Sequence, residues 1–188
     1  MRWIVHGERL VYQSKWLELF LSDVELPGGV RYEHHVIRLA PSVAVVVLDD
    51  ADRVLMLWRH RFITDTWNWE VPGGSVDVGE TPRESAAREA EEETGWRPHE
   101  LSELAYIQSL AGIAGAEQHI FLASGASYIG PPADPHESDR IAWIPLANVP
   151  DMVARGLIVG GATVVGLLQL TLSRCRTLGD AGLNHCGR

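Results

Sequence analysis

The sequence predicts an α/β fold, because strand-like segments lie on both sides of one strongly signalled helix. The clearest strand is the apolar run at residues 43–48, whose lack of alternation is typical of a strand buried on both faces. The clearest helix covers residues 81–95, where good helix formers lie between cap residues. A length of 188 residues corresponds to one full domain with at most a small appendage.

The N-terminal part is expected to be a β-hairpin or meander. Segments 17–26 and 30–39 carry strand patterns and flank the turn sequence Pro-Gly-Gly at 27–29. Further strands are expected at residues 53–58, 106–110, 119–123 and 141–144, and further helices at 148–155 and 163–174.

Three parts of the chain follow from these patterns. Residues 1–40 form the N-terminal strands, residues 41–176 form the main domain, and residues 177–188 are expected to be a flexible tail. Within the main domain, residues 125–140 are rich in glycine, proline and charge, which predicts a long mobile loop. Long loops in compact domains are often functional.

The helix at 81–95 carries its own start and stop signals. Thr81 is a cap residue, Pro82 suits the first turn, and Glu84 completes a capping box with Thr81. Gly95 can end the helix in a left-handed conformation. These signals fix the phase of the helix and therefore the direction of its charged side chains.

Composition narrows the function. Sixteen Lys and Arg against 25 Asp and Glu give a net charge of −9, which disfavours nucleic acid as a partner. An acidic protein that handles a phosphorylated small molecule needs a divalent cation between the two. The N-terminus lacks a signal-peptide pattern, the longest apolar run is too short to span a membrane, and the only cysteines are Cys175 and Cys186. We therefore expect a cytoplasmic protein without a membrane partner.

Three carboxylates share one face of the helix. Glu89, Glu92 and Glu93 are spaced at i, i+3 and i+4, whereas Glu91 points to the other side. No lysine follows them along the helix to neutralise the three negative charges. An acidic helix face is commonly a solvated surface, but glycines just upstream allow backbone carbonyls to approach an ion, and oxygen ligands suit Mg²⁺ or Mn²⁺.

The helix is part of a longer motif. Residues 74–96 read G-x5-E-x7-R-E-A-E-E-E-T-G-W. This resembles the Nudix box, G-x5-E-x7-R-E-U-x-E-E-x-G-U, in which U is bulky or aliphatic, at every fixed position. Upstream, Arg59-x-Arg61 followed by the sequence WEVPGG at 69–74 resembles the ADP-ribose pyrophosphatase branch of that family. The resemblance implies an α/β/α sandwich with a mixed β-sheet, preceded by the N-terminal hairpin or meander.

The resemblance also implies roles for individual residues. The metal ligands it implies are Glu89, Glu92, Glu93 and the Gly73 carbonyl, with Mg²⁺ or Mn²⁺ as the ion. It places Arg88 and Glu92 in the catalytic machinery, with Glu80 supporting the carboxylates and Arg88 pairing with Glu92 along the helix. It points to Arg61, Trp69 and Glu70 as substrate-binding residues, although core packing competes with base stacking as the interpretation of Trp69.

A general base is expected outside the helix, because the helix carboxylates are occupied by metal. In the branch resembled, this carboxylate comes from a loop after the sheet, which corresponds here to residues 131–140. Glu137 is the first candidate, with Asp139 and Asp134 as alternatives.

The activity that the resemblance implies is metal-dependent hydrolysis of a pyrophosphate bond. The expected substrate is a small nucleoside diphosphate linked to another moiety, above all ADP-ribose or an NDP-sugar. Residues 109–112 (Ser-Leu-Ala-Gly) lack a proline that this branch often carries, so the motif predicts the reaction better than the substrate. The alternatives are a dinucleotide pyrophosphatase acting on NADH, FAD or a diadenosine polyphosphate, and a catalytically silent nucleotide-binding module. Relatives in this branch are dimers that exchange N-terminal strands, so a homodimer formed through residues 1–40 is expected.

Overall fold

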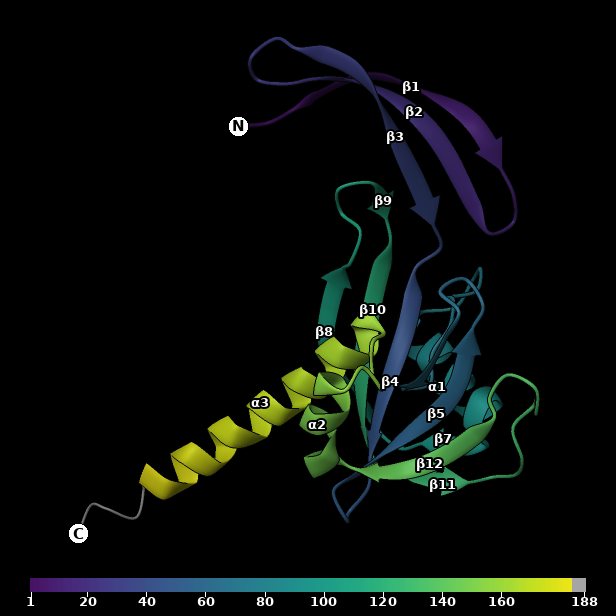
Figure 1. The fold of residues 1–188 in the computed structure, drawn as a ribbon, viewed down its shortest axis with the longest axis vertical. Coiled ribbons are helices and arrows are strands. Elements are labelled where there is room, and N and C mark those ends of the chain that lie inside the picture. The colour runs from purple at the N-terminus through teal and green to yellow at the C-terminus, as the bar shows by residue number, and fades with distance from the viewer. Residues whose placement is uncertain (184–188) are drawn as a thin grey trace.

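The domain is an α/β/α sandwich built around a mixed sheet. The computed structural model describes residues 1–183, with side chains through Arg174. The sheet has the strand order β12-β5-β4-β10-β8 (Arg140–Pro145, Arg53–Arg61, Ser42–Leu48, Glu117–Ser124 and Leu101–Gln108), and β6 (Thr66–Glu70) pairs with β5. Helix α1 (Pro82–Thr94) covers one face, whereas α2 (Val149–Ala154) and α3 (Gly161–Leu183) cover the other (Figure 1). The predicted α/β class is confirmed.

Strand β4 lies at the centre of the sheet, parallel to β10 and antiparallel to β5. Val43, Val45 and Val47 pack into the α1 layer, and Ala44 and Val46 into the α2–α3 layer. Burial on both faces explains the unbroken apolar run, because neither face of the strand meets solvent.

Residues 70–75 extend β6 along β4. Val45 and Val43 donate backbone hydrogen bonds to the carbonyls of Pro72 (2.9 Å) and Gly74 (2.8 Å), and an isolated bridge joins Ser42 to Ser75. This segment carries the chain from the sheet to α1.

The N-terminal strands form a meander that stands apart from the domain (Figure 1). Antiparallel pairing joins β1 (Ile4–Gln13) to β2 (Leu17–Glu25) and β2 to β3 (Arg31–Leu39). Strand β3 meets the domain through a short parallel pairing with β9 (Ala114–Gly115). Every residue of β1 is exposed. The expected N-terminal β element is therefore present, with one strand more than a hairpin.

Several expected elements have different bounds in the structure. Strand β8 begins at Leu101 rather than 106, β5 continues to Arg61 rather than 58, and α3 runs from Gly161 to Leu183 rather than over 163–174. The strand β6 was not expected. Neither was the short ladder of β7 (Trp96–Pro98) with β11 (Ala126–Tyr128), which falls partly inside the predicted loop 125–140. A short 3₁₀ helix, Leu146–Asn148, precedes α2.

The predicted tail at 177–188 overlaps the last turns of α3, while residues 184–188 and the side chains of Cys175 and Cys186 lie outside the described part of the chain. Its flexibility stays a prediction. Among the helices described, none is long and apolar enough to cross a membrane.

Candidate active site

Helix α1 is fixed in phase by its caps and by its alanine flank. Thr81 and Glu84 form both hydrogen bonds of a capping box, and Gly95 ends the helix at φ 73° in the left-handed region, as predicted. Ala86 and Ala90 are fully buried against the sheet. Small side chains on this flank let the helix approach β4 closely, so its acidic face lies beside residues 72–75.

Two glycines pass between β4 and the helix carboxylates. A Cβ atom on Gly73 would lie 2.2 Å from the Val43 carbonyl oxygen, and a Cβ atom on Gly74 would lie 2.4 Å from the carboxyl carbon of Glu89. Any other residue would displace the backbone or the carboxylate. The Gly73 amide donates a hydrogen bond to Glu93 at 2.8 Å. Among the hydrogen bonds of residues 1–174, none is accepted by the Gly73 carbonyl.

Arg88 connects the carboxylates on the outer side of the helix. Its Nε donates to Glu80 at 3.0 Å, and its Nη1 donates to Glu89 at 2.9 Å and to Glu92 at 3.0 Å. The predicted pairing of Arg88 with Glu92 is present, and two further carboxylates share the same guanidinium. Burial raises the pKa of Glu89, and the charges of Glu93 and Glu92 raise it further, against the hydrogen bond from Arg88.

A second arginine binds the carboxylate on the inner side. Arg59 on β5 is only 6% exposed and donates from Nη1 to Glu93 at 2.7 Å. Its Nε lies 3.8 Å from Glu70, too far for a hydrogen bond. Glu70 is instead held by Arg61, whose Nε lies 3.0 and 3.1 Å from the two carboxylate oxygens. Glu93 thus has both oxygens engaged, one by Arg59 and one by the Gly73 amide.

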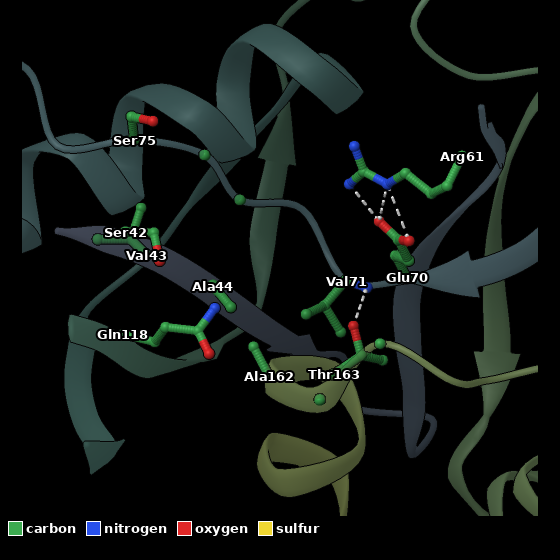
Figure 2. Close-up of a pocket in the computed structure, with 14 residues that line it drawn as sticks. Ser42, Val43, Ala44, Arg61, Glu70, Val71, Ser75, Gln118, Ala162 and Thr163 are labelled. Carbon is green, nitrogen blue, oxygen red and sulfur yellow. Dashed lines mark hydrogen bonds and ion pairs between the residues drawn. The ribbon is translucent and has the colours of Figure 1, made fainter. Parts of the chain in front are cut away.

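A cavity of about 370 Å³ borders this network. It lies between β4, β10, residues 70–75 and the N-terminal end of α3. Figure 2 shows Arg61 and Glu70 on one side and Gln118 and Ala162 on the other. The Val71 amide donates to the Thr163 hydroxyl at 3.2 Å, which ties the wall near Glu70 to α3. Arg61, Glu70 and Thr163 therefore supply polar groups to the wall of the cavity.

The loop that precedes β12 is held at both ends. The Ala133 amide donates to the carbonyl of Glu92 at 2.7 Å, and the Asp139 amide donates to the carbonyl of Trp58 at 2.9 Å. Between these points lies Glu137, which is exposed at the surface. Partial burial raises the pKa of its carboxyl, the charge of Glu93 raises it further, and Arg59 acts in the opposite direction. The segment between these two anchors is therefore residues 134–138, and the mobility expected of the loop stays a prediction.

The structure brings most of the predicted site residues together, with one correction. Glu89, Glu92, Glu93, Arg88 and residue 73 meet at the acidic face of α1, while Arg61 and Glu70 line the adjoining cavity. Trp69 lies elsewhere, because side chains alternate along β6. Its ring packs against the apolar cluster on the α2–α3 face, the opposite side of the sheet from Glu70.

Asp134 and Asp139, the alternative bases, are both exposed. Asp134 accepts a hydrogen bond from the His136 amide at 2.8 Å, which organises the turn. Asp139 lies at the point where the loop joins β12.

Two features of the site were not predicted from the sequence. No lysine follows the three carboxylates and only Arg88 was expected to pair with them, yet Arg59 supplies a second cation from another element. Asn68, which is 1% exposed and lies opposite Arg59 in the β5–β6 ladder, also faces this layer. Within the residues whose side chains are described, no three His, Cys, Asp or Glu groups converge as metal ligands. The alternation of side chains along a strand could have indicated this role, because it places Arg59 on the same face of the strand as Arg61.

Comparisons with known proteins agree with this geometry. A model of the NUDIX domain matches residues 38–158. The CMP-5'-(N-acetyl-N-hydroxy-3-aminopropyl)phosphonate hydrolase of Streptomyces rubellomurinus is 45% identical over 170 residues, which are 90% of this chain and 82% of that protein. The ADP-ribose pyrophosphatase of Mycobacterium tuberculosis is 32% identical over 152 residues, which are 79% and 73% of the two chains.

A solved structure shares the fold. A crystal structure described as that of an ADP compounds hydrolase superimposes with a TM-score of 0.80 at 21% identity, covering 91% of this chain and 93% of that one. The sandwich, the intact motif and the matched domain agree with one another. The chain therefore belongs to the Nudix family and is a hydrolase of its ADP-ribose pyrophosphatase-like branch.

Proposed function

We propose that this hydrolase cleaves the P–O–P anhydride that links a nucleoside 5'-phosphate to a second phosphorus-containing group. The observation that carries the proposal is the acidic face of α1, which the caps and the two glycines hold beside residues 73–75, a segment that also lines the cavity. ADP-ribose and NDP-sugars are the first candidate substrates. The ADP-ribose pyrophosphatases of M. tuberculosis and Bacillus subtilis, 32% and 30% identical, support this choice.

A second candidate is an anhydride between a nucleotide and a phosphonate. The 45% identity to the CMP-phosphonate hydrolase extends over 90% of this chain and favours it. Both candidates present the same anhydride to the site and differ in the base and in the leaving group. The proposal therefore specifies the bond that is cleaved and leaves two classes of substrate.

The residues of the site fit a divalent ion. The Gly73 carbonyl is free to coordinate, Glu89 is a partly buried carboxylate whose pKa is raised, and all donors are oxygens, which suits Mg²⁺ or Mn²⁺. Glu89, Glu92, Glu93 and this carbonyl would hold the ion, and Arg59 and Arg88 would yield part of their contacts to it. When bound, such an ion withdraws charge from phosphate oxygens and lowers the pKa of coordinated water.

Separate side chains of the site bind the substrate, accept the proton and orient the carboxylates. Arg61, at the cavity wall, binds an anionic oxygen of the substrate, and Glu70 fixes the orientation of its guanidinium. Glu137 accepts the proton of the attacking water as the new P–O bond forms and the anhydride P–O bond breaks, with the leaving phosphate or phosphonate departing as an anion. Arg88 keeps Glu89 and Glu92 apart and oriented.

We further propose a homodimer formed through the N-terminal meander. Large apolar side chains on β1 are exposed, among them Ile4 (54%), Val5 (58%) and Tyr12 (56%). Three strands with so little contact to the main domain are weakly stable alone. Packing against the meander of a second copy of the chain would bury this apolar surface. The molar mass in solution, compared between the full chain and a Val5→Glu variant, tests this.

The decisive experiment is a substrate panel. ADP-ribose, a UDP-sugar, a CMP-phosphonate anhydride, NADH and diadenosine tetraphosphate are incubated with Mg²⁺ or Mn²⁺ and the products are identified. Release of a nucleoside monophosphate from the first three supports the proposal. Turnover of NADH or diadenosine tetraphosphate alone would favour a dinucleotide pyrophosphatase. Binding without turnover would make the chain a silent module, and full turnover in excess chelator would overturn the metal assignment.

A further inference from the structure

Arg59 carries hydrogen-bond donors that nothing in the described structure uses. Its Nη1 donates to Glu93, whereas Nε and Nη2 are buried without a hydrogen-bond partner among residues 1–174. Burying unpaired guanidinium donors is costly, because water that would have solvated them is lost. A buried arginine with one paired and two unpaired nitrogens indicates that a further acceptor is bound in some state of the protein.

The carboxylates around Arg59 differ in the hydrogen bonds that they already accept. Glu93 has both oxygens engaged, by Arg59 itself and by the Gly73 amide. Glu70 is bonded through both oxygens to Arg61. The carboxylate of Glu137 accepts no hydrogen bond within the part of the chain that the structure describes. Glu137 is therefore the neighbouring acid with free oxygens.

Loop geometry keeps Glu137 near the same end of β5. The Asp139 amide binds the carbonyl of Trp58, the residue just before Arg59, and the Ala133 amide binds the carbonyl of Glu92, the residue just before Glu93. Both anchors of segment 134–138 thus lie one residue from the two members of the Arg59–Glu93 ion pair. In keeping with this placement, partial burial raises the pKa of the Glu137 carboxyl, the charge of Glu93 raises it further, and the charge of Arg59 lowers it.

We propose that Arg59 is a positioning residue for Glu137: its free Nε and Nη2 bind the Glu137 carboxylate when segment 134–138 folds inward, which gives a Glu93–Arg59–Glu137 bridge. One carboxylate oxygen of Glu137 is held by the guanidinium, and the other remains free to accept a proton from water. The bridge joins α1 to the loop through a strand that contacts both. Its catalytic consequence rests on the proposed function, whereas the contact itself does not.

The variant that tests the bridge is Arg59→Lys. Lysine keeps a positive charge for Glu93 but lacks the planar fork of nitrogens with which one guanidinium binds Glu93 through Nη1 and presents Nε and Nη2 to a second carboxylate. The matched control is Arg97→Lys, because Arg97 binds Glu91 with Nε and Nη2 on the far side of the same helix. Arg59→Gln is a second and more severe variant that also leaves Glu93 without its cation.

Hydrogen exchange of segment 134–138 is measured on the metal-free protein, so the readout does not need activity. We expect exchange to rise about tenfold in Arg59→Lys, equally in Glu137→Gln, and no further in the double variant, as follows from losing one charged hydrogen bond. Residues 129–133, held by Glu92 and Gly95, and the Arg97→Lys control should be unchanged. Unaltered exchange of 134–138 in Arg59→Lys would overturn the bridge.

The kinetic cycle gives an independent readout on the active enzyme. Arg59→Lys should lower kcat by about tenfold with KM nearly unchanged, and should lower it little further when Glu137 is already Gln. Multiplicative losses in the double variant, or a rise in KM alone, would mean that Arg59 binds substrate or only supports Glu93, and would overturn the proposal. If no panel substrate is turned over, the proposed function fails while the exchange result still decides the bridge.

Discussion

The two faces of the central sheet carry opposite kinds of side chain from the same strands. On β5, Arg59 points to the α1 layer and binds Glu93, whereas Met56 is fully buried among apolar residues on the α2–α3 side. On β6, Glu70 lines the cavity, whereas Trp69, its neighbour, packs into the apolar cluster. Neighbouring residues of one strand therefore face the charged site and the hydrophobic core, on opposite sides of the sheet.

This difference shows how the domain stabilises several carboxylates that lie close together on one face of the sheet. Burial of charged groups costs free energy unless they are paired, and the α1 face pairs them through Arg59, Arg61 and Arg88. The α2–α3 face instead carries a cluster of apolar side chains, which supplies hydrophobic stabilisation. Substitutions on the first face should change catalysis, and substitutions on the second should change stability.

The largest effect is expected at Glu93. Glu93→Gln keeps the shape of the side chain but removes a charge from the proposed metal site, so kcat should fall by at least about a hundredfold while the fold persists. Circular dichroism and steady-state kinetics measure both. The matched control is Glu91→Gln on the far side of α1, where the carboxylate binds Arg97 at the surface at 2.7 Å. Equal losses from both variants would show that the role given to this face is wrong.

Glu137 should come next. Glu137→Gln is expected to lower kcat by roughly 10²-fold with little change in KM, because a general base acts mainly in the transition state. Asp134→Asn should be mild, since Asp134 organises the turn through the His136 amide. Near-normal kcat in Glu137→Gln together with inactive Asp139→Asn would transfer the role of base to Asp139.

The opposite face provides the third test. Met56→Ala removes a fully buried side chain from the α2–α3 cluster and should lower the free energy of unfolding by about 2–5 kcal/mol. Denaturant titration measures this loss. The kcat of the remaining folded enzyme should be unchanged, because Met56 packs among apolar side chains on the face of β5 opposite Arg59. A large fall in kcat without loss of stability would contradict the separation of the two faces.

Much of this arrangement is local and was therefore predictable. The caps Thr81 and Gly95 determine where α1 begins and ends, and the i, i+3, i+4 spacing determines that Glu89, Glu92 and Glu93 share a face. The unbroken run in β4 indicates a central strand because only burial on both faces permits it.

The remainder depends on contacts between distant segments. The pairing of Arg59 with Glu93 joins residues 34 positions apart, and no local pattern specifies it. The aromatic residues of β6 predict neither its pairing with β5 nor which of Trp69 and Glu70 faces the cavity, since both follow from the register. The anchoring of the loop by Glu92 and Trp58 uses backbone groups, which carry no sequence signal.

The smallest expected effect concerns pH and the stability of the charged face. Glu80 accepts hydrogen bonds from Arg88 (3.0 Å) and Ser85 (2.5 Å), and these, Arg88 first, lower the pKa of its carboxyl to about 2. A lowered pKa means that the ionised form is favoured in the folded state. Its stabilisation is complete above the ordinary value of 4.5 and is lost as pH falls from there through about 2.

Glu80→Gln should therefore lower the free energy of unfolding slightly near neutral pH, and the difference from the unaltered protein should shrink as the medium is acidified below pH 4.5. The effect is small because Glu80 is partly exposed and salt screens it. Glu100→Gln, at an exposed position outside the network, is the control. Denaturant titrations over this pH range give the comparison with Met56→Ala, whose deficit is hydrophobic and should stay constant with pH. A Glu80→Gln deficit that also stayed constant on acidification would mean that this carboxylate stabilises the fold by packing rather than by charge, and the contrast between the two faces would weaken.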